Sequence, residues 1–241
     1  MKNNIRKPLG VIFDFGNTVL RQEWFDTLAG NRRLLELADN HAGVTIEDVR
    51  AAAEEVTRWI EPVKNESMIE ITCQSLSRLI YGPLGLTFSA SPAELEREFW
   101  QASLKYAPMN GIHELLDTLE TQGIRTGILS NSMYGAAMKR EELARHNLAH
   151  RFSFIVTSAD YGVRKPHKFI FRVAVKKMGL DPADIWFVGD TPQQDIRGAL
   201  GAGLYPVWLN WRQEPRAVDG DYLEVGTLDE LRQEIERLYR R

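Results

Sequence analysis

The stretch VIFDFGNTVL, residues 11–20, decides the fold that this sequence predicts. A run of apolar residues, Val11 to Phe13, ends at a carboxylate, Asp14. Gly16 and Asn17 follow, both of residue types that are common in turns, and the chain then becomes apolar again. A buried strand that ends in an acid and a turn is typical of a functional site at the carboxyl edge of a parallel sheet.

Further apolar segments alternate with helical patterns along the chain. The predicted strands are 9–15, 125–130, 152–157, 185–188 and 205–209, and the predicted helices are 112–121, 136–146, 169–178, 195–202 and 228–239. This spacing predicts right-handed βαβ units in one parallel sheet. Near-continuous apolar strands are typical of a sheet that helices cover on both faces. We therefore predict an α/β fold with a doubly wound, Rossmann-like parallel sheet.

The segment from residue 21 to residue 107 breaks this alternation and has only helical patterns. Predicted helices cover 24–37, 45–60, 66–80 and 92–106. Ser91 followed by Pro92 is typical of a helix start, with the serine as cap and the proline in the first turn. We therefore predict two units, a core of residues 1–20 and 108–241 and a helical cap domain of residues 21–107.

The composition disfavours several classes of protein. The 241 residues carry a net charge of −3 and the pI is about 6.0, which is not typical of a nucleic-acid-binding protein. No apolar run approaches the roughly 20 residues that a membrane helix needs, and the first residues lack a signal-peptide pattern. Cys73 is the only cysteine, so no internal disulfide forms. These features favour a cytoplasmic protein without nucleic acid or membrane as partner; they do not indicate an oligomeric state.

Polar residues follow the ends of four predicted strands, where a parallel sheet forms its sites. They are Asp14 after the first strand, Ser130 and Asn131 after the second, Lys165 after the third, and Asp190 with Asp195 after the fourth. Two acids flanking a turn suit a hard cation, which prefers oxygen ligands. Each residue alone also has an ordinary interpretation, such as a solvated loop side chain or an acid at a helix N-terminus. Their order along the chain indicates a shared function.

This order of motifs resembles the haloacid dehalogenase-like (HAD) superfamily, most of whose members are phosphatases. The motifs are DFGNT at residues 14–18, LSN at 129–131, Lys165, and GDTPQQD at 189–195. An insertion directly after the first motif is similar to the C1 cap of that family. The resemblance implies a Mg²⁺-dependent phosphatase whose substrate is a small phosphorylated metabolite, with sugar phosphates among the candidates.

The resemblance also implies a role for each motif residue. Asp14 is the nucleophile and forms an aspartyl-phosphate. The Mg²⁺ ligands are Asp14, the backbone carbonyl of Gly16, and Asp190. The remaining implied roles are phosphoryl binding for Ser130 and Lys165, substrate contact for Thr18 and Asn131, and orientation of Lys165 or a metal-bound water for Asp195.

One position departs from the usual family pattern, D-x-D-G-T. Gly16 stands where relatives carry the general acid/base Asp, and Asn17 replaces the usual glycine. Asparagine tolerates left-handed backbone better than most residues, so we expect the turn to persist. General acid/base help is worth about 10²–10⁴-fold in rate. Three interpretations stay open: the cap supplies the group, with Glu23 and Asp26 as candidates; the leaving group needs no proton; or the chain is a weakly active, phosphate-binding protein.

Two other hydrolases stay open as alternatives. A 2-haloacid dehalogenase also uses an Asp nucleophile without the second Asp, but it needs no metal and leaves the pair of acids in GDTPQQD unexplained. A phosphonate hydrolase uses a cap lysine, for which Lys64 is the candidate. The cap aromatics either line a substrate pocket or, as is more common, pack between helices; they are Trp24, Trp59, Trp100 and Tyr106.

Overall fold

A computed structural model describes residues 6–41 and 43–240 of the chain. Its main sheet has six strands in the order β5-β4-β1-β6-β7-β8, and all neighbouring strands are parallel. The strands are β1 (Gly10–Phe13), β4 (Arg125–Ser130), β5 (Ile155–Thr157), β6 (Ile185–Gly189), β7 (Tyr205–Leu209) and β8 (Leu223–Val225). Strands β4 and β5 extend the sheet on one side of β1, and β6, β7 and β8 then extend it on the other side. The strand order therefore reverses between β1 and β6. This confirms the predicted doubly wound α/β fold, to which the short edge strand β8 is an addition.

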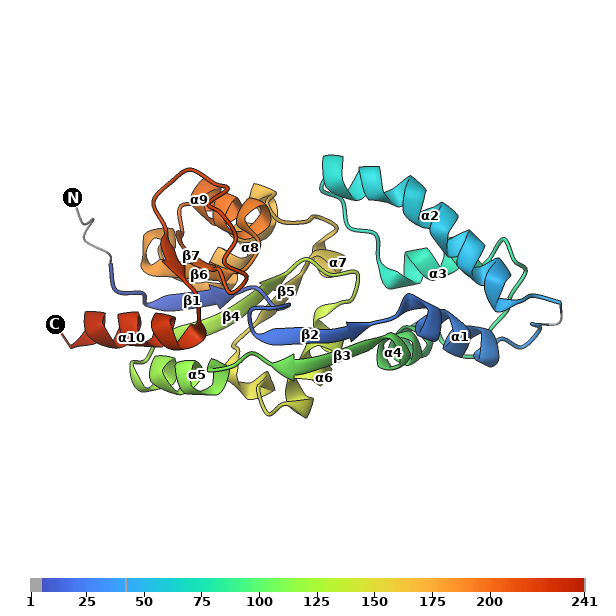
Figure 1. The fold of residues 1–241 in the computed structure, drawn as a ribbon, viewed down its shortest axis with the longest axis horizontal. Coiled ribbons are helices and arrows are strands. Elements are labelled where there is room, and N and C mark those ends of the chain that lie inside the picture. Colours follow the sequence, from blue (N-terminus) through green and yellow to red (C-terminus); the bar gives the residue numbers. More distant parts are fainter. Residues whose placement is uncertain (1–5, 42, 241) are drawn as a thin grey trace.

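Helices cover both faces of the sheet (Figure 1). They are α5 (Ile112–Thr121), α6 (Ala136–Arg145), α7 (Ser158–Tyr161), α8 (Lys168–Met178), α9 (Arg197–Ala202) and α10 (Leu228–Tyr239). Side chains of β1 alternate between the faces, because successive residues of a strand point in opposite directions. Val11 and Phe13 pack with residues of α5 and α10, whereas Ile12 packs with residues of α8.

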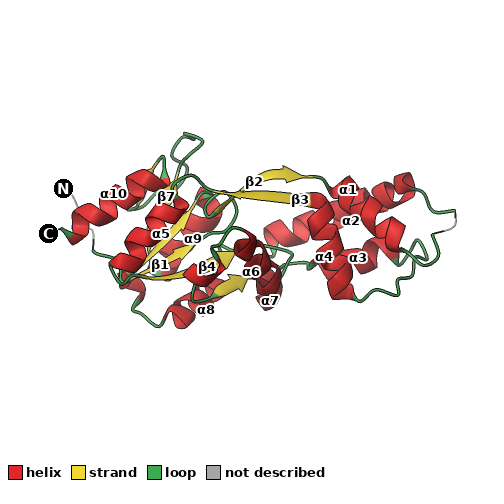
Figure 2. Ribbon diagram, turned by 90° about the horizontal axis from the view of Figure 1, so that it is seen from below, coloured by secondary structure: helices red, strands yellow, loops and turns green. Residues whose placement is uncertain are grey.

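The other end of the molecule is a group of four helices, which we call the cap (Figures 1 and 2). They are α1 (Thr27–Leu37), α2 (Ile46–Glu66), α3 (Cys73–Tyr81) and α4 (Pro92–Ser103). Ser91 accepts from the backbone of Glu94 and the Glu94 carboxylate accepts from the backbone of Ser91, which confirms the predicted start of α4. Among the described helices, none combines the length and apolar character that crossing a membrane requires.

The segment between core and cap is not all-helical, which corrects the prediction. Strands β2 (Leu20–Phe25) and β3 (Leu104–Pro108) pair antiparallel and form a ribbon that joins the two ends of the molecule (Figure 2). Trp24 therefore lies in a strand, and the helix predicted at 92–106 ends at Ser103. Only Leu20 of β2 is buried, so the strand lacks the apolar alternation that would identify it in the sequence. Both predicted unit boundaries fall at this ribbon, and the division into two units stays a prediction.

Two other helix predictions also need correction. The helix predicted at 66–80 is divided, because α2 continues to Glu66 and α3 begins only at Cys73. The helix predicted at 195–202 begins as a π-helix, Pro192–Ile196, before α9. Both differences lie where the chain forms contacts between core and cap or within the site, which local patterns do not encode.

Aromatic side chains pack at the junction between core and cap. The ring of Tyr106 on β3 lies 5.6 Å from that of Phe15 and 5.6 Å from that of Trp100 on α4. Trp100 is only 1% exposed. Trp24 and Trp59 are instead exposed. Of the four predicted cap aromatics, Trp100 and Tyr106 thus pack the junction.

Candidate active site at the carboxyl edge of the sheet

The strand-end residues meet at one edge of the main sheet. Asp14 directly follows β1, and its backbone N–H donates to the Val188 carbonyl of β6 at 2.8 Å. Asp190 directly follows β6, and Ser130 ends β4, the other neighbour of β1. Because the three strands are parallel, these residues lie together where the strand order reverses. An open α/β sheet forms its ligand site at this position.

Lys165 is a buried cation at the centre of this edge. Its Nζ donates to Asp14 Oδ1 at 2.5 Å and to Asp195 Oδ1 at 2.7 Å. The residue is only 3% exposed. Burial alone would lower the pKa of Lys165, but the combined charges of Asp14 and Asp195 raise it. The ammonium therefore stays protonated between two carboxylates.

Three carboxylates come close together beside this lysine. Asp14, Asp190 and Asp195 are buried and each offers one oxygen atom, and these atoms lie within 4.8 Å of one another. Burial and then the Asp14 charge raise the pKa of Asp190, while Arg212 lowers it. Burial also raises the pKa of Asp195, against the opposing charge of Lys165. A buried set of hard oxygen donors with excess negative charge fits a divalent cation such as Mg²⁺.

The π-helix places Asp195 against the end of β6. The Thr191 backbone N–H donates to Asp195 Oδ2 at 2.9 Å, and the Thr191 hydroxyl donates to Asp190 Oδ1 at 3.1 Å. A Cβ atom on Gly189 would lie 2.4 Å from the Asp195 carboxyl carbon. Only glycine at position 189 lets the Asp195 carboxylate approach this closely.

Asn131 holds the backbone of Lys165. Its Oδ1 accepts from Lys165 N at 2.7 Å, and its Nδ2 donates to Lys165 O at 3.1 Å and to Gln194 Oε1 at 3.0 Å. The Asn131 amide is thus engaged with the protein on both of its polar atoms. Its predicted contact with substrate stays a prediction, and the geometry adds a role in placing Lys165.

Ser130 and Thr18 are both deeply buried. The Ser130 hydroxyl makes one long hydrogen bond, to the Asn131 carbonyl at 3.4 Å. Thr18 Oγ1 is buried and has no hydrogen-bond partner among residues 6–41 and 43–240. Thr18 is also 0% exposed, so its hydroxyl is enclosed by protein. The predicted roles of both residues in binding phosphoryl oxygens or substrate stay predictions.

Gly16 leaves open space beside the predicted nucleophile. A Cβ atom placed there would have no heavy atom within 4 Å, and the φ angle of Gly16 lies outside the left-handed region. Asn17 takes the left-handed conformation instead, with φ 56°, which confirms the predicted turn. The turn therefore does not require a glycine at position 16, where the family pattern described above has an aspartate.

The two acids proposed from the sequence as replacements have other partners. Glu23 on β2 accepts from Arg21 at 3.0 Å and lies 3.5 Å from Lys105, and the hydrogen bond from Arg21 is the main cause of its lowered pKa. Asp26 is the N-cap of α1, and its Oδ1 accepts from two backbone N–H groups at 2.9 and 3.1 Å. Both carboxylates are thus engaged outside the cluster around Lys165.

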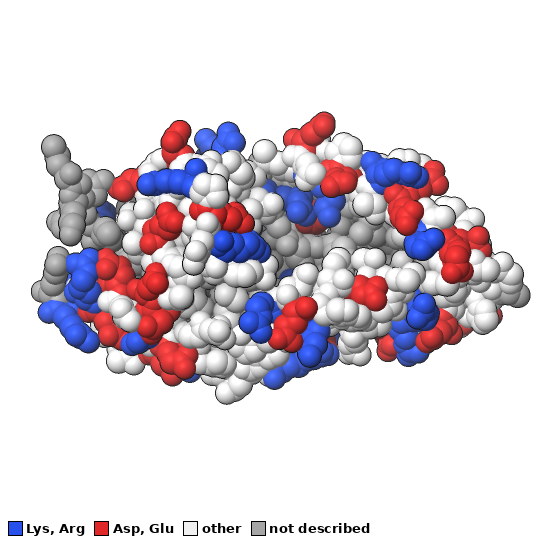
Figure 3. Space-filling model, viewed as in Figure 1, with Lys and Arg blue, Asp and Glu red and all other residues white. Residues whose placement is uncertain are grey.

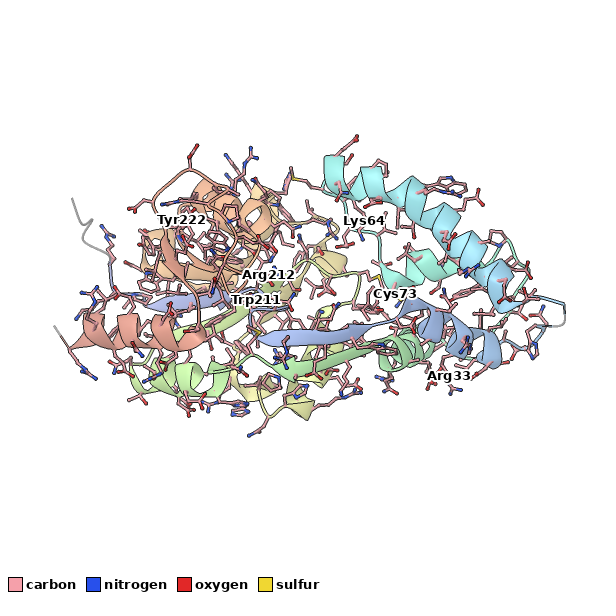
Figure 4. All side chains as sticks on the ribbon, viewed as in Figure 1. Arg33, Lys64, Cys73, Trp211, Arg212 and Tyr222 are labelled. Carbon is pink, nitrogen blue, oxygen red and sulfur yellow. The ribbon has the colours of Figure 1, made fainter. Side chains whose placement is uncertain are left out.

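Arg212 is a site residue that the sequence analysis missed. Its Nη1 donates to Asp190 Oδ2 at 3.1 Å, and its guanidinium lies 4.3 Å from the ring centre of Trp211. Figure 4 shows both residues on the core, near the region that faces the cap. Arg212 lies just after the end of β7. A search for polar residues after this strand, as was done for the other four, would have found it.

Lys139 is a second buried lysine near the site, also missed. It lies on α6, is 4% exposed, and has no hydrogen-bonding or ion-pair partner for its ammonium among the described residues. Its Nζ lies 4.0 Å from the ring centre of Phe15, 4.8 Å from that of Trp100 and 5.6 Å from that of Tyr106. Burial lowers the pKa of Lys139 to about 7, against the opposing charge of Asp14.

Comparison with known proteins identifies relatives of this chain. The sequence model of a family described as haloacid dehalogenase-like hydrolase matches residues 9–203. Phosphoserine phosphatase from Thermus thermophilus is 32% identical over 139 residues, which are 57% of this chain and 55% of that protein. The chain therefore spans just over half the length of this relative.

One curated relative and one solved structure match over nearly the whole chain. Pyrimidine 5′-nucleotidase YjjG from Escherichia coli is 28% identical over 228 residues, 92% of this chain and 96% of that protein. The crystal structure of 2-haloacid dehalogenase from Pseudomonas syringae pv. Tomato DC3000 matches with a TM-score of 0.66 at 20% identity, covering 95% of this chain and 98% of that one. The structural match shows a shared fold.

Proposed function

This chain belongs to the haloacid dehalogenase-like hydrolases, and we propose that it is a Mg²⁺-dependent phosphatase that hydrolyses a small phosphorylated metabolite through an aspartyl-phosphate at Asp14. The observation that carries this proposal is the contact of one buried ammonium, Lys165, with both Asp14 and Asp195, beside Asp190. A nucleophilic carboxylate, a cation for the phosphoryl oxygens and a set of oxygen ligands are the parts that phosphoryl transfer needs.

In the first step an oxygen of Asp14 attacks phosphorus. A new O–P bond forms, and the bond from phosphorus to the leaving oxygen breaks with its electron pair on that oxygen. The Lys165 ammonium lies beside the attacking carboxylate and stabilises the negative charge of the phosphoryl oxygens. Ser130, at the end of the neighbouring strand, is proposed to donate its hydroxyl to the same oxygens. Water then attacks phosphorus, releases phosphate and restores Asp14.

The carboxylates are proposed to hold the metal. Asp14, Asp190 and the backbone carbonyl of Gly16 are the proposed ligands, and Asp195 orients Lys165 from behind. A bound Mg²⁺ supplies the positive charge that lets a carboxylate and a phosphate anion approach each other. Arg212 compensates part of the Asp190 charge, and its contact with Asp190 would have to rearrange if Asp190 turns toward a cation.

The relatives narrow the substrate class. Of the two curated relatives named above, the one that matches over nearly the whole chain is a pyrimidine 5′-nucleotidase, and the other is a phosphoserine phosphatase. These names support a small phosphate ester, with nucleoside 5′-monophosphates and sugar phosphates as the first candidates. Without a carboxylate at Gly16, esters whose leaving groups need no proton should react fastest.

A panel of phosphate esters tests this proposal. We expect the chain to release phosphate from p-nitrophenyl phosphate and from at least one nucleoside monophosphate or sugar phosphate when Mg²⁺ is present. EDTA should abolish the release, and Mg²⁺ should restore it. Phosphate release from no ester, together with metal-independent halide release from 2-chloropropionate, would overturn the proposal.

A further inference from the structure

A loop of the cap lies against the core directly before Lys165. Residues 67–72 connect α2 to α3, and Ile69 forms an antiparallel bridge with Val163. The Glu70 backbone N–H donates to Gly162 O at 3.0 Å, and the Arg164 N–H donates to Met68 O at 2.8 Å. This contact is separate from the β2–β3 ribbon, and it ends at the residue that precedes Lys165.

The side chain of Glu70 is fully buried in this contact and has two partners from the core and one from the cap. Its side chain is 0% exposed. The Arg164 guanidinium donates to Glu70 Oε2, and the Ser158 hydroxyl donates to the same oxygen at 2.5 Å. Lys64 of α2 lies 3.7 Å from the other oxygen. Burying a carboxylate costs several kcal/mol unless charges and hydrogen bonds compensate it, so this group depends on its core partners.

Ser158 extends the contact to the second strand-end motif. Its Oγ accepts from the Ser132 backbone N–H at 2.8 Å while it donates to Glu70. Ser132 directly follows Asn131, whose amide holds Lys165 by hydrogen bonds to both its N–H and its carbonyl. Glu70 thus reaches the Lys165 backbone by two routes, one through Arg164 and one through Ser158.

We propose that Glu70 is a positioning residue of the cap, which holds the loops before Lys165 and after Ser130 in their reactive arrangement when the cap is docked on the core. Lys64 and Arg164 are the two cations beside Glu70. The contact of Lys64 with Glu70 favours a structural role for this lysine over the role of a Schiff-base lysine in a phosphonate hydrolase. Figure 4 shows Lys64 at the end of the cap that faces the core. The effect of Glu70 on turnover rests on the proposed phosphatase activity, whereas its effect on the loops does not.

Glu70→Gln tests the inference, because it keeps the shape of the side chain and removes the charge. A matched control is Glu141→Gln, since Glu141 of α6 pairs with Arg97 of the cap helix α4 at 3.2 Å but lies on the surface. Both variants therefore lose one ion pair between cap and core. Hydrogen exchange is measured by mass spectrometry on peptides that cover residues 67–72 and 162–165.

We expect Glu70→Gln to exchange faster in both segments and Glu141→Gln to match wild type there. On a phosphate ester that wild type hydrolyses, Glu70→Gln should lower kcat by about 10- to 100-fold, because displaced catalytic groups cost this much, with KM changed far less. The control should keep both constants. Should Glu70→Gln fail to fold, Ser158→Ala is used instead. This variant removes the hydrogen bonds that link Glu70 to the Ser132 backbone, and it removes no charge.

Unchanged exchange at 162–165 in a folded Glu70→Gln protein would overturn the inference, as would equal effects of the two variants. The outcomes for the two proposals are separable. A wild-type protein that releases no phosphate overturns the phosphatase proposal, while the exchange comparison still decides the role of Glu70.

Discussion

At the scale of single residues, Gly16 is the position at which one substitution should accelerate the proposed reaction. Its φ angle and the empty space around it permit a side chain. We predict that Gly16→Asp accelerates hydrolysis of esters with poor alkoxide leaving groups, by about tenfold or more, since a positioned acid/base contributes about 10²–10⁴-fold. Aryl phosphates should change little. Gly16→Ala is the control, because it adds a Cβ atom without a carboxylate.

The measurement is kcat/KM plotted against the pKa of the leaving group for the three proteins. Wild type should show a steep dependence that Gly16→Asp flattens. A wild-type protein whose rate does not depend on the leaving group would show that another group already supplies the proton.

Lys139 permits a prediction on stability. Burial lowers its pKa to about 7 from the ordinary lysine value of 10.5. Between these two values the unfolded chain binds more protons than the folded chain, so this residue makes the free energy of unfolding rise with pH across that window. Lys139→Met removes this cost. At pH 6 the variant should be more stable than wild type by up to about 5 kcal/mol, at about 1.4 kcal/mol per unit of pKa.

Urea unfolding at pH 6, 8 and 10 checks this prediction. The difference in the free energy of unfolding between variant and wild type should shrink as pH rises. The charged groups near Lys139 are Asp14 and Glu142, whose negative charges oppose the effect of burial on its pKa, and the ring of Tyr106 also faces it. Lys177→Met on the exposed side of α8 is the control. A stability difference that stays constant with pH would contradict a lowered pKa of Lys139.

The strand-end residues were predictable because each follows an apolar run that is visible in the sequence. Asp14, Lys165, Asp190 and Asp195 do come together. Lys139 was not predictable, because its surroundings come from an aromatic cluster assembled by three separate elements.

At the scale of elements, variants of Asp26 at the N-terminus of α1 distinguish a role as helix cap from a role as general acid. Asp26 caps this helix, so Asp26→Ala should lower the free energy of unfolding by about 1 kcal/mol, whereas Asp26→Asn should keep the cap. Neither variant should lower kcat more than twofold. Thermal unfolding and steady-state kinetics provide the two readouts. A folded Asp26→Asn protein without turnover would instead identify Asp26 as the missing acid.

The helices and parallel strands followed from periodicity, but the β2–β3 ribbon did not. The residues of β2 pair with partners about eighty positions away, such as Arg21 with Ala107, and most of them are exposed. No local pattern encodes such a pairing, and helical propensity in the neighbouring residues favoured the wrong assignment. The loop at 67–72 was missed for the same reason, because its contacts lie in the core.

At the scale of the whole molecule, charge is mixed over the surface, and the hollow between core and cap is the distinctive feature of the face in Figure 3. A cavity of about 670 Å³ lies within the cap and is lined by residues of α1, α2 and α3, with Met133 from the core. The family and the fold are shown, whereas the substrate and the cytoplasmic location stay predictions.

Metal binding should stabilise the whole chain. A ligand at about one hundred times its Kd adds about 2.7 kcal/mol to the free energy of unfolding, so saturating Mg²⁺ should raise Tm by several degrees. Asp190→Ala should lose this shift while it remains folded. Differential scanning fluorimetry with Mg²⁺ and with EDTA measures it. Equal Tm values in both conditions, with activity that survives EDTA, would favour the carbon–halogen hydrolase.

The proposed mechanism depends on a covalent intermediate on Asp14, which acid-quenched mass spectrometry during turnover can detect. Enzyme mixed with excess p-nitrophenyl phosphate and Mg²⁺ is quenched in acid, digested with pepsin and mapped. We predict one added phosphoryl group on the peptide that contains Asp14, formed as fast as nitrophenol is released and absent from Asp14→Asn, which should be folded and inactive. Steady turnover with no phosphoryl group on that peptide, or an Asp14→Asn protein that retains more than a few per cent of wild-type activity, would contradict it.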